Sequence, residues 1–315
     1  MTTNHDTDIS DSQQCESSVP QSIQEFPIRR AEIGQGTVIK RALPSRHKRM
    51  IGAWCFLDHA GPVHFPQGDG LDVGPHPHIG LQTFTWMIEG TIMHTDSLGS
   101  KQLIRPYQVN LMTAGHGISH TEVAPEHETK MHAVQLWIAL PDEKRNMAPQ
   151  FDHYPNLPHT EQDQIKFTVL VGEFLGQQSP VAVHTPLVGV DMTAQADTKT
   201  RISLNPTFEY GFLALDGHAW INGHELTQDN LLVLESGASE IEIELPQGHR
   251  VLLIGGEPFK TPILLWWNLV GRTTEELREA RDQWINHDSR FGEIPDYDGP
   301  RLEAPAFPDQ MRASK

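Results

Sequence analysis

Short, strand-length segments separated by turn-forming residues run through most of this chain. Residues 83–88, 133–140 and 167–171 are rich in β-branched and aromatic side chains and are bounded by Gly, Pro, Asp or Asn. The 25 glycines and 23 prolines supply many such turns. In places the segments follow one another at roughly 8–12 residues, which is typical of a β-sandwich or a β-barrel. We therefore expect an all-β fold.

The same order of strands and turns occurs in both halves of the chain. The segment at residues 83–88 ends in an acidic residue and a glycine, as does the segment at residues 208–215. Residues 111–112 and residues 231–234 both run into a further glycine turn. Because 315 residues suit two domains of about 150 residues each, a tandem duplication of one β-barrel unit is the simplest explanation. The alternative is that chance spacing of turns produces part of this similarity.

A helix is expected near the end of the chain, packed against a barrel. Thr273 and Glu276 have the spacing of a capping box, and Leu277, Ala280 and Trp284 follow at helical intervals. We expect a polar, disordered leader at residues 1–26, a first barrel at 27–150, a second barrel at 151–292 that includes a helix at 274–287, and a tail at 293–315.

Charge and cysteine content argue against several classes of protein. The formal net charge is −17, from 24 basic and 41 acidic side chains, whereas a nucleic-acid backbone is bound by clustered Lys and Arg. We therefore expect no direct nucleic-acid binding. Only Cys15 and Cys55 are present and no signal peptide is visible, so we expect a cytoplasmic protein without a disulfide framework. The apolar runs are too short to span a bilayer, so we expect no membrane attachment.

Two closely spaced pairs of potential metal ligands carry the strongest functional signal. His76 and His78 precede a predicted strand, and His120 and Glu122 have the same spacing some forty residues later. On a strand, residues i and i+2 share a face, so each pair aims two side chains at one point. A lone His-x-His is more often a surface feature. The second pair favours a mononuclear metal site held by His76, His78, His120 and Glu122.

Three imidazoles and one carboxylate suit several metal ions. Fe(II), Mn, Ni, Cu and Zn all accept such a set. Four protein ligands leave one or two coordination positions open on a five- or six-coordinate ion, as a catalytic site requires.

These motifs resemble those of the cupin superfamily and, more narrowly, of the pirin family. The pattern G-x5-H-x-H at residues 70–78 resembles the first cupin motif, and T-A-G followed by His120 resembles the second. The usual glutamate of the first motif would fall at Gln82 or Thr83. Pirins take their carboxylate two residues after the histidine of the second motif, which is Glu122 here. One departure is that Ile-Gly-Leu-Gln at residues 79–82 replaces the usual Arg-Gly-Phe-Glu.

The resemblance implies a bicupin, with two tandem jelly-roll barrels and a short C-terminal helix. It also implies that only the first barrel binds metal. In the second barrel the positions that match His76 and His78 fall near Ser203 and Asn205. The match to His120 falls on Ile241 or on Glu242, depending on one residue of alignment, and neither supplies an imidazole.

Several further side chains lie near the expected site in sequence. His116 could orient a ligand or substrate, or could be an ordinary loop residue. His94 and Asp96 are more simply explained as stabilising a turn. His132 is expected at the surface or at a strand edge. Most of the aromatic side chains of the first barrel, Trp137 among them, are expected in the core, and one or two could line an apolar pocket.

The resemblance implies two functions. The first is an iron-dependent dioxygenase that acts on a flavonol such as quercetin and dioxygen, with Glu122 as the candidate catalytic base. The second is a redox-responsive, metal-dependent co-regulator that acts through a protein partner. We expect an apolar entrance built from Ile79 and Leu81 to favour a small aromatic substrate, and a charged surface beside the metal to favour a partner protein. A monomer is expected, because the two barrels already pair with each other.

Overall fold

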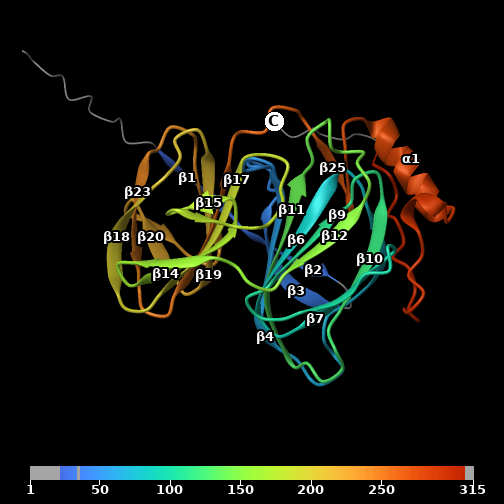
Figure 1. Ribbon diagram of the computed structural model, residues 1–315, viewed down its shortest axis with the longest axis horizontal. Coiled ribbons are helices and arrows are strands. Elements are labelled where there is room, and N and C mark those ends of the chain that lie inside the picture. Colours follow the sequence, from blue (N-terminus) through green and yellow to red (C-terminus); the bar gives the residue numbers. More distant parts are fainter. Residues whose placement is uncertain (1–21, 34–35, 309–315) are drawn as a thin grey trace, which may run out of the picture.

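The computed structural model describes residues 22–33 and 36–308. Two β-barrels lie side by side, each a sandwich of a seven-stranded and a four-stranded sheet within these ranges (Figure 1). The expected all-β bicupin with a short C-terminal helix is confirmed. No helix among the described residues is both long and apolar enough to cross a membrane.

The first barrel encloses the predicted ligands between its two sheets. Its large sheet has the order β12-β9-β6-β11-β4-β3-β2, and its small sheet has the order β5-β10-β7-β8. Their bounds are β2 (Arg29–Ile33), β3 (Thr37–Leu43), β4 (Trp54–His64), β5 (Asp72–His78), β6 (Leu81–Glu89), β7 (Ile92–Asp96), β8 (Lys101–Ile104), β9 (Val109–Thr113), β10 (Ile118–Val123), β11 (Lys130–Ala139) and β12 (Gln150–Tyr154).

The second barrel repeats this plan. Its large sheet has the order β1-β22-β19-β24-β17-β14-β13, and its small sheet has the order β18-β23-β20-β21. The bounds are β1 (Ile23–Pro27), β13 (His159–Gln162), β14 (Ile165–Val171), β17 (Leu187–Ala194), β18 (Thr198–Ser203), β19 (Glu209–Asp216), β20 (Ala219–Ile221), β21 (His224–Leu226), β22 (Asn230–Leu234), β23 (Glu240–Leu245) and β24 (Arg250–Gly256); β15 (Glu173–Phe174) and β16 (Gln177–Gln178) form a separate ribbon.

The two barrels share one apolar interface. Side chains of both large sheets form a single buried cluster that includes Trp54 and Trp86 of the first barrel. The indole Nε1 of Trp54 donates to the carbonyl of Gly255 at 3.1 Å, and Nε1 of Trp86 donates to Asp191 at 2.9 Å. Both indole donors are therefore satisfied where they are buried, which ties the two barrels together.

The N-terminal strand of the described chain joins the second barrel, and the C-terminal segment packs against the first. Strand β1 pairs antiparallel with β22, so Ile23–Pro27 complete the large sheet of the second barrel although they precede the first. This corrects the expected leader at its C-terminal end: residues 1–21 lie outside the described residues, but a strand begins at Ile23. The apolar side chains of Ile23 and Phe26 pack against the two buried clusters, which explains why this short segment joins the sheet.

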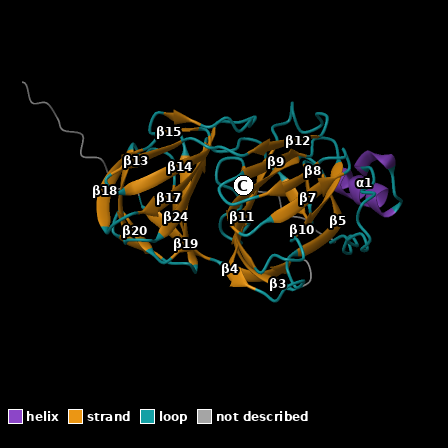
Figure 2. Cartoon of the chain, turned by 60° about the horizontal axis from the view of Figure 1, so that its bottom comes forward, coloured by secondary structure: helices purple, strands orange, loops and turns teal. Residues whose placement is uncertain are grey.

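The C-terminal segment returns to the first barrel. After β24 the chain forms β25 (Leu264–Trp266), β26 (Leu269–Gly271), α1 (Thr274–Ile285) and a short 3-10 helix, η1 (Ser289–Phe291). Figures 1 and 2 show α1 beside the first barrel, away from the second. Its buried residues Leu277, Ala280 and Trp284 pack with Ile79 of the first barrel. The helix expected at 274–287 is therefore present, but it does not belong with the second barrel.

Candidate metal centre and its cavity

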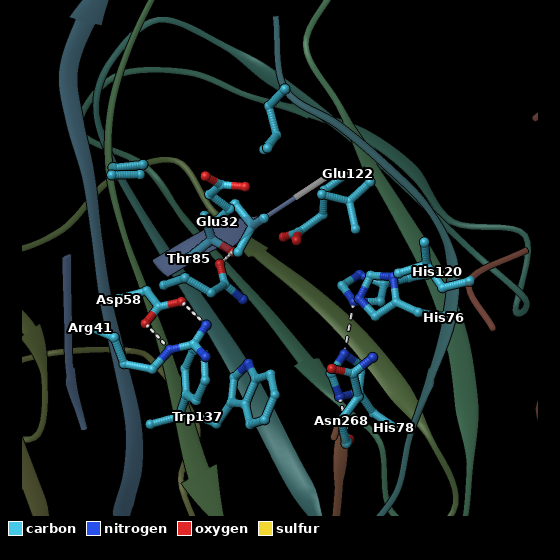
Figure 3. Close-up of a pocket in the computed structure, with 18 of the residues that line it drawn as sticks. Glu32, Arg41, Asp58, His76, His78, Thr85, His120, Glu122, Trp137 and Asn268 are labelled. Carbon is cyan, nitrogen blue, oxygen red and sulfur yellow. Dashed lines mark hydrogen bonds and ion pairs between the residues drawn. The ribbon is translucent and has the colours of Figure 1, made fainter. Parts of the chain in front are cut away.

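Three histidines converge inside the first barrel. His76 and His78 lie on β5, and His120 lies opposite His76 on the neighbouring strand β10. One ring nitrogen from each of the three lies within 4.8 Å of the others. All three side chains are buried, and Figure 3 shows them grouped on one side of a cavity. The structure therefore brings together the three imidazoles that the sequence predicted.

Backbone carbonyls orient two of these imidazoles. Nδ1 of His76 lies 2.8 Å from the carbonyl oxygen of Gly74, and Nδ1 of His78 lies 2.8 Å from the carbonyl oxygen of Asn268. Each Nδ1 must donate to its carbonyl, so each Nε2 is the unprotonated nitrogen that a metal can bind. Nε2 of His78 lies 3.1 Å from Nε2 of His120, which shows that these atoms face the same point.

A histidine and a carboxylate stand behind His120. Nδ1 of His120 lies 3.3 Å from Nδ1 of His94, and Nε2 of His94 lies 3.0 Å from Asp96. Asp96 in turn accepts hydrogen bonds from the backbone N–H groups of Leu98 and Ser100. His94 and Asp96 were expected to stabilise a turn, and Asp96 does so. The sequence alone missed their contact with His120, although the spacing H-x-D on a strand was the available signal.

Burial keeps the three imidazoles neutral. It lowers the pKa of His76 to about 4, and it holds the pKa values of His78 and His120 well below the usual value of 6.5. The neutral imidazole is the form that binds a metal. Buried, converging and oriented nitrogens of this kind fit a divalent transition-metal ion.

Glu122 lies in the same cavity but outside the compact group of three. A β-bulge separates His120 from Glu122 on β10, so the two side chains are not simply stacked along one face. Burial raises the pKa of the Glu122 carboxyl to about 7, and the hydroxyl of Thr85 opposes this shift. Figure 3 shows the carboxylate pointing into the cavity. The assignment of Glu122 as a fourth ligand stays a prediction.

The cavity between the two sheets has a volume of about 540 Å³. Phe56 and Trp137 stack at 4.0 Å between ring centroids on its wall, and the rings of Trp137 and His78 meet edge to face with their centroids 5.1 Å apart. The C-terminal segment contributes Trp267 and Asn268 to the lining. This segment therefore forms part of the cavity wall, and its Asn268 carbonyl orients His78.

A row of polar side chains faces the histidines from the large sheet. Cross-strand pairs place Arg29 opposite Arg41, Arg41 opposite Asp58, Asp58 opposite Gln135, and Gln135 opposite Thr85. All five line the cavity. Nε and Nη2 of Arg41 donate to the two carboxylate oxygens of Asp58 at 2.7 and 2.6 Å (Figure 3). Burial nevertheless raises the pKa of the Asp58 carboxyl above its usual value.

Other sequence expectations have mixed outcomes. Ile79 and Leu81 are fully buried in neighbouring clusters and do not line the cavity, so neither contributes to an apolar entrance. His116 is exposed and contacts the carbonyl of Met147, as an ordinary loop residue would. His132 is buried, contrary to expectation. Trp137 is the aromatic residue of the expected set that lines the cavity.

Family comparisons cover both barrels. The family model described as Pirin matches residues 36–138, and the model described as Pirin C-terminal cupin domain matches residues 189–292. The chain belongs to the pirin family. The resemblance drawn from the two cupin motifs is thus confirmed. The first of these matches contains the three histidines of this pirin.

Named relatives are similar over nearly the whole chain. A Pseudomonas aeruginosa protein, provisionally named quercetin 2,3-dioxygenase, is 48% identical over 97% of this chain and 97% of its own. A Caulobacter vibrioides pirin-like protein is 36% identical over 82% of this chain and 91% of its own. A crystal structure of a quercetin 2,3-dioxygenase from Acinetobacter baumannii has a TM-score of 0.92 at 79% identity, covering 93% of this chain and 98% of that one.

Proposed function

We propose that this pirin is an iron-dependent dioxygenase that acts on a flavonol such as quercetin. The observation that carries the proposal is the group of three buried, neutral imidazoles at one side of a cavity of about 540 Å³. That volume lies within the usual range for small-molecule sites, roughly 300–1,000 Å³. The names of the relatives from Pseudomonas aeruginosa and Acinetobacter baumannii support the choice of substrate.

His76, His78 and His120 would hold the metal, with Glu122 as a candidate fourth ligand. When bound, a divalent ion supplies Lewis acidity that lowers the pKa of a substrate hydroxyl. Glu122 is the candidate that would accept the proton that this hydroxyl loses, because its carboxylate lines the cavity and burial raises its pKa in the metal-free protein. Proton acceptance close to neutral pH is what a general base requires.

The aromatic wall would position a flat substrate. A flat ring that packs beside Phe56 and Trp137 would lie close to His78, because the ring centroids of Trp137 and His78 are 5.1 Å apart. The apolar lining, which includes Leu71, Val73 and Met131, would exclude water from the reacting end of the ring.

Oxygen uptake tests the proposal directly. Iron-reconstituted protein would be mixed with quercetin, and wild type would be compared with His120→Ala. The matched control is His116→Ala, which removes an exposed imidazole near the site in sequence but outside the cavity. We expect uptake by wild type and the control, and none by His120→Ala. No uptake above the buffer blank by wild type, with one iron bound per chain, would sink the flavonol proposal.

A second candidate function is a redox-responsive co-regulator that acts through a protein partner. The observation that favours it is the charge of the cavity lining, which includes Arg29, Glu32 and the ion pair of Arg41 and Asp58. Bound iron without oxygen uptake in the presence of quercetin would favour this second function.

A further inference from the structure

Two arginines stand directly opposite each other at the edge of the cavity. Arg29 on β2 and Arg41 on β3 are cross-strand partners, and both line the cavity. Like charges in this position repel, which costs stability. Burial and the charge of Arg41 lower the pKa of Arg29, while Asp58 opposes that shift. Asp58 accepts hydrogen bonds from Nε and Nη2 of Arg41, so that two of these three side chains are positive and one is negative.

The cavity continues into a basic groove that shares these two arginines. The groove has a volume of about 490 Å³ and adds Arg46, His47 and Arg49 to Arg29 and Arg41. Among the described residues, its lining contains no carboxylate. This concentration of positive charge contrasts with a net charge of −17 for the whole chain. Such a groove attracts and holds anionic groups.

An unbroken series of contacts joins the histidines to the arginines. The ring centroids of Trp137 and His78 are 5.1 Å apart, Trp137 stacks on Phe56, and the guanidinium of Arg41 lies 4.5 Å from the centroid of the Phe56 ring. A planar ligand that follows this surface has one end at the imidazoles and the other at Arg41. Figure 3 shows the ion pair of Arg41 and the histidines on opposite sides of the cavity, with Trp137 between them.

We propose that Arg29 and Arg41 bind an anionic substituent, a carboxylate or a sulfate, on an aromatic substrate whose other end meets the three histidines. This inference rests on the proposed small-molecule function and specifies the class of substrate. Arginine suits this role because its planar set of donors matches the oxygens of such groups. The aromatic wall holds the ring, and the arginines select the charged end.

Calorimetric titration without oxygen tests this inference independently of turnover. The probes are quercetin and quercetin that carries a sulfate on its B ring, each added to the metal-loaded protein. We expect the sulfated ligand to bind wild type roughly tenfold to a hundredfold more tightly, the range of one or two charge-assisted hydrogen bonds. Arg29→Gln should remove most of that preference, and added salt should reduce it.

Adjacent residues of β2 provide the matched control. Arg30 is exposed and lines neither the cavity nor the basic groove. Arg30→Gln therefore removes the same charge from the outer face of β2 and should keep the preference for the sulfated ligand. The double variant Arg41→Gln/Asp58→Asn removes the second guanidinium without leaving Asp58 as a buried, unpaired carboxylate, and should weaken binding of the sulfated ligand.

The outcomes separate this inference from the proposed function. Arg29-dependent binding of the sulfated ligand without oxygen uptake would support the inference while the dioxygenase proposal fails. Equal affinity for the two probes, equal losses in Arg29→Gln and Arg30→Gln, or no binding of either probe would overturn the inference. The dioxygenase proposal is tested separately, by oxygen uptake with quercetin.

Discussion

The two barrels have the same strand order, but the side chains that fill their interiors differ in polarity and packing. In the small sheet of the first barrel, His120 lies opposite His76; at the corresponding place in the second barrel, Ile241 of β23 lies opposite Ile202 of β18. The second interior is filled by one apolar cluster, whereas the first encloses a cavity of about 540 Å³. One backbone plan thus serves either as a packed core or as a ligand chamber, depending on the side chains that point inward.

The second barrel also shows how its strand register determines which residues point inward. Ile241 and Ile243 are buried, while Glu242 pairs with Lys199 on the outer face at 2.7 Å. The two alternatives that the sequence left open are therefore resolved in favour of the isoleucines. The expected match of His76 and His78 to Ser203 and Asn205 is one residue out of register, because Ile202 and Leu204 are the buried positions.

The largest expected effect concerns metal binding. His76→Ala should abolish stoichiometric binding of one divalent ion per chain, because it removes a nitrogen from a set of three. Ile202→Ala alters the corresponding position of the second barrel and should leave the stoichiometry unchanged. Metal analysis of the purified proteins after dialysis measures both. Retention of one ion by His76→Ala would mean that the metal binds elsewhere.

The free energy of unfolding should be more sensitive to a substitution inside the second barrel than to one inside the first. Ile241→Ala opens a cavity in the packed interior and should lower the free energy of unfolding by about 2–5 kcal/mol. His120→Ala, at the corresponding place in the first barrel, borders an existing cavity and should cost less in metal-free protein. Urea titrations of the two metal-free variants provide the comparison. Equal losses would indicate that the first interior is as closely packed as the second.

The sequence predicted the convergence of His76, His78 and His120 and the presence of two barrels because both depend on local patterns. Spacing of i and i+2 on a strand needs no knowledge of distant contacts, whereas the pairing of β1 with β22 joins segments about 200 residues apart. The same applies to Asn268, whose carbonyl orients His78 across 190 residues of chain. The buried ring of His132 contacts that of His59, 73 positions away in the chain, and no periodicity indicates such a contact.

A smaller effect should follow from the support behind His120. His94→Ala removes the imidazole beside Nδ1 of His120, and we expect metal affinity to fall about 10–100-fold, as is typical for partners that orient a ligand. Stoichiometry should recover at high metal concentration, unlike in His76→Ala. A competition titration with a metal-binding dye measures the affinity. Unchanged affinity would restrict His94 and Asp96 to the turn that they stabilise.

The smallest expected effect distinguishes the histidine pairs of the two barrels. His59 and His132 of the first barrel are buried with Nε2 atoms 2.8 Å apart, whereas His218 and His249 of the second are half-buried. Burial first, and then His132, lower the pKa of His59 to about 3. The charged groups that act on this pair are Lys40, Glu89, Asp216 and Arg250.

Proton binding at His59 determines the direction in which stability changes with pH. Between pH 6.5 and pH 3 the unfolded chain binds a proton at His59 that the folded chain does not, so the stability contributed by neutral His59 is complete above pH 6.5 and is lost as the pH falls. The loss is at most about 1.4 kcal/mol per pH unit. Urea titrations from pH 7.5 to 5.5 should therefore give a shallower pH dependence for His59→Gln than for wild type, with His218→Gln as the control for loss of an imidazole. Identical slopes in wild type and His59→Gln would show that His59 does not stay neutral in the folded protein.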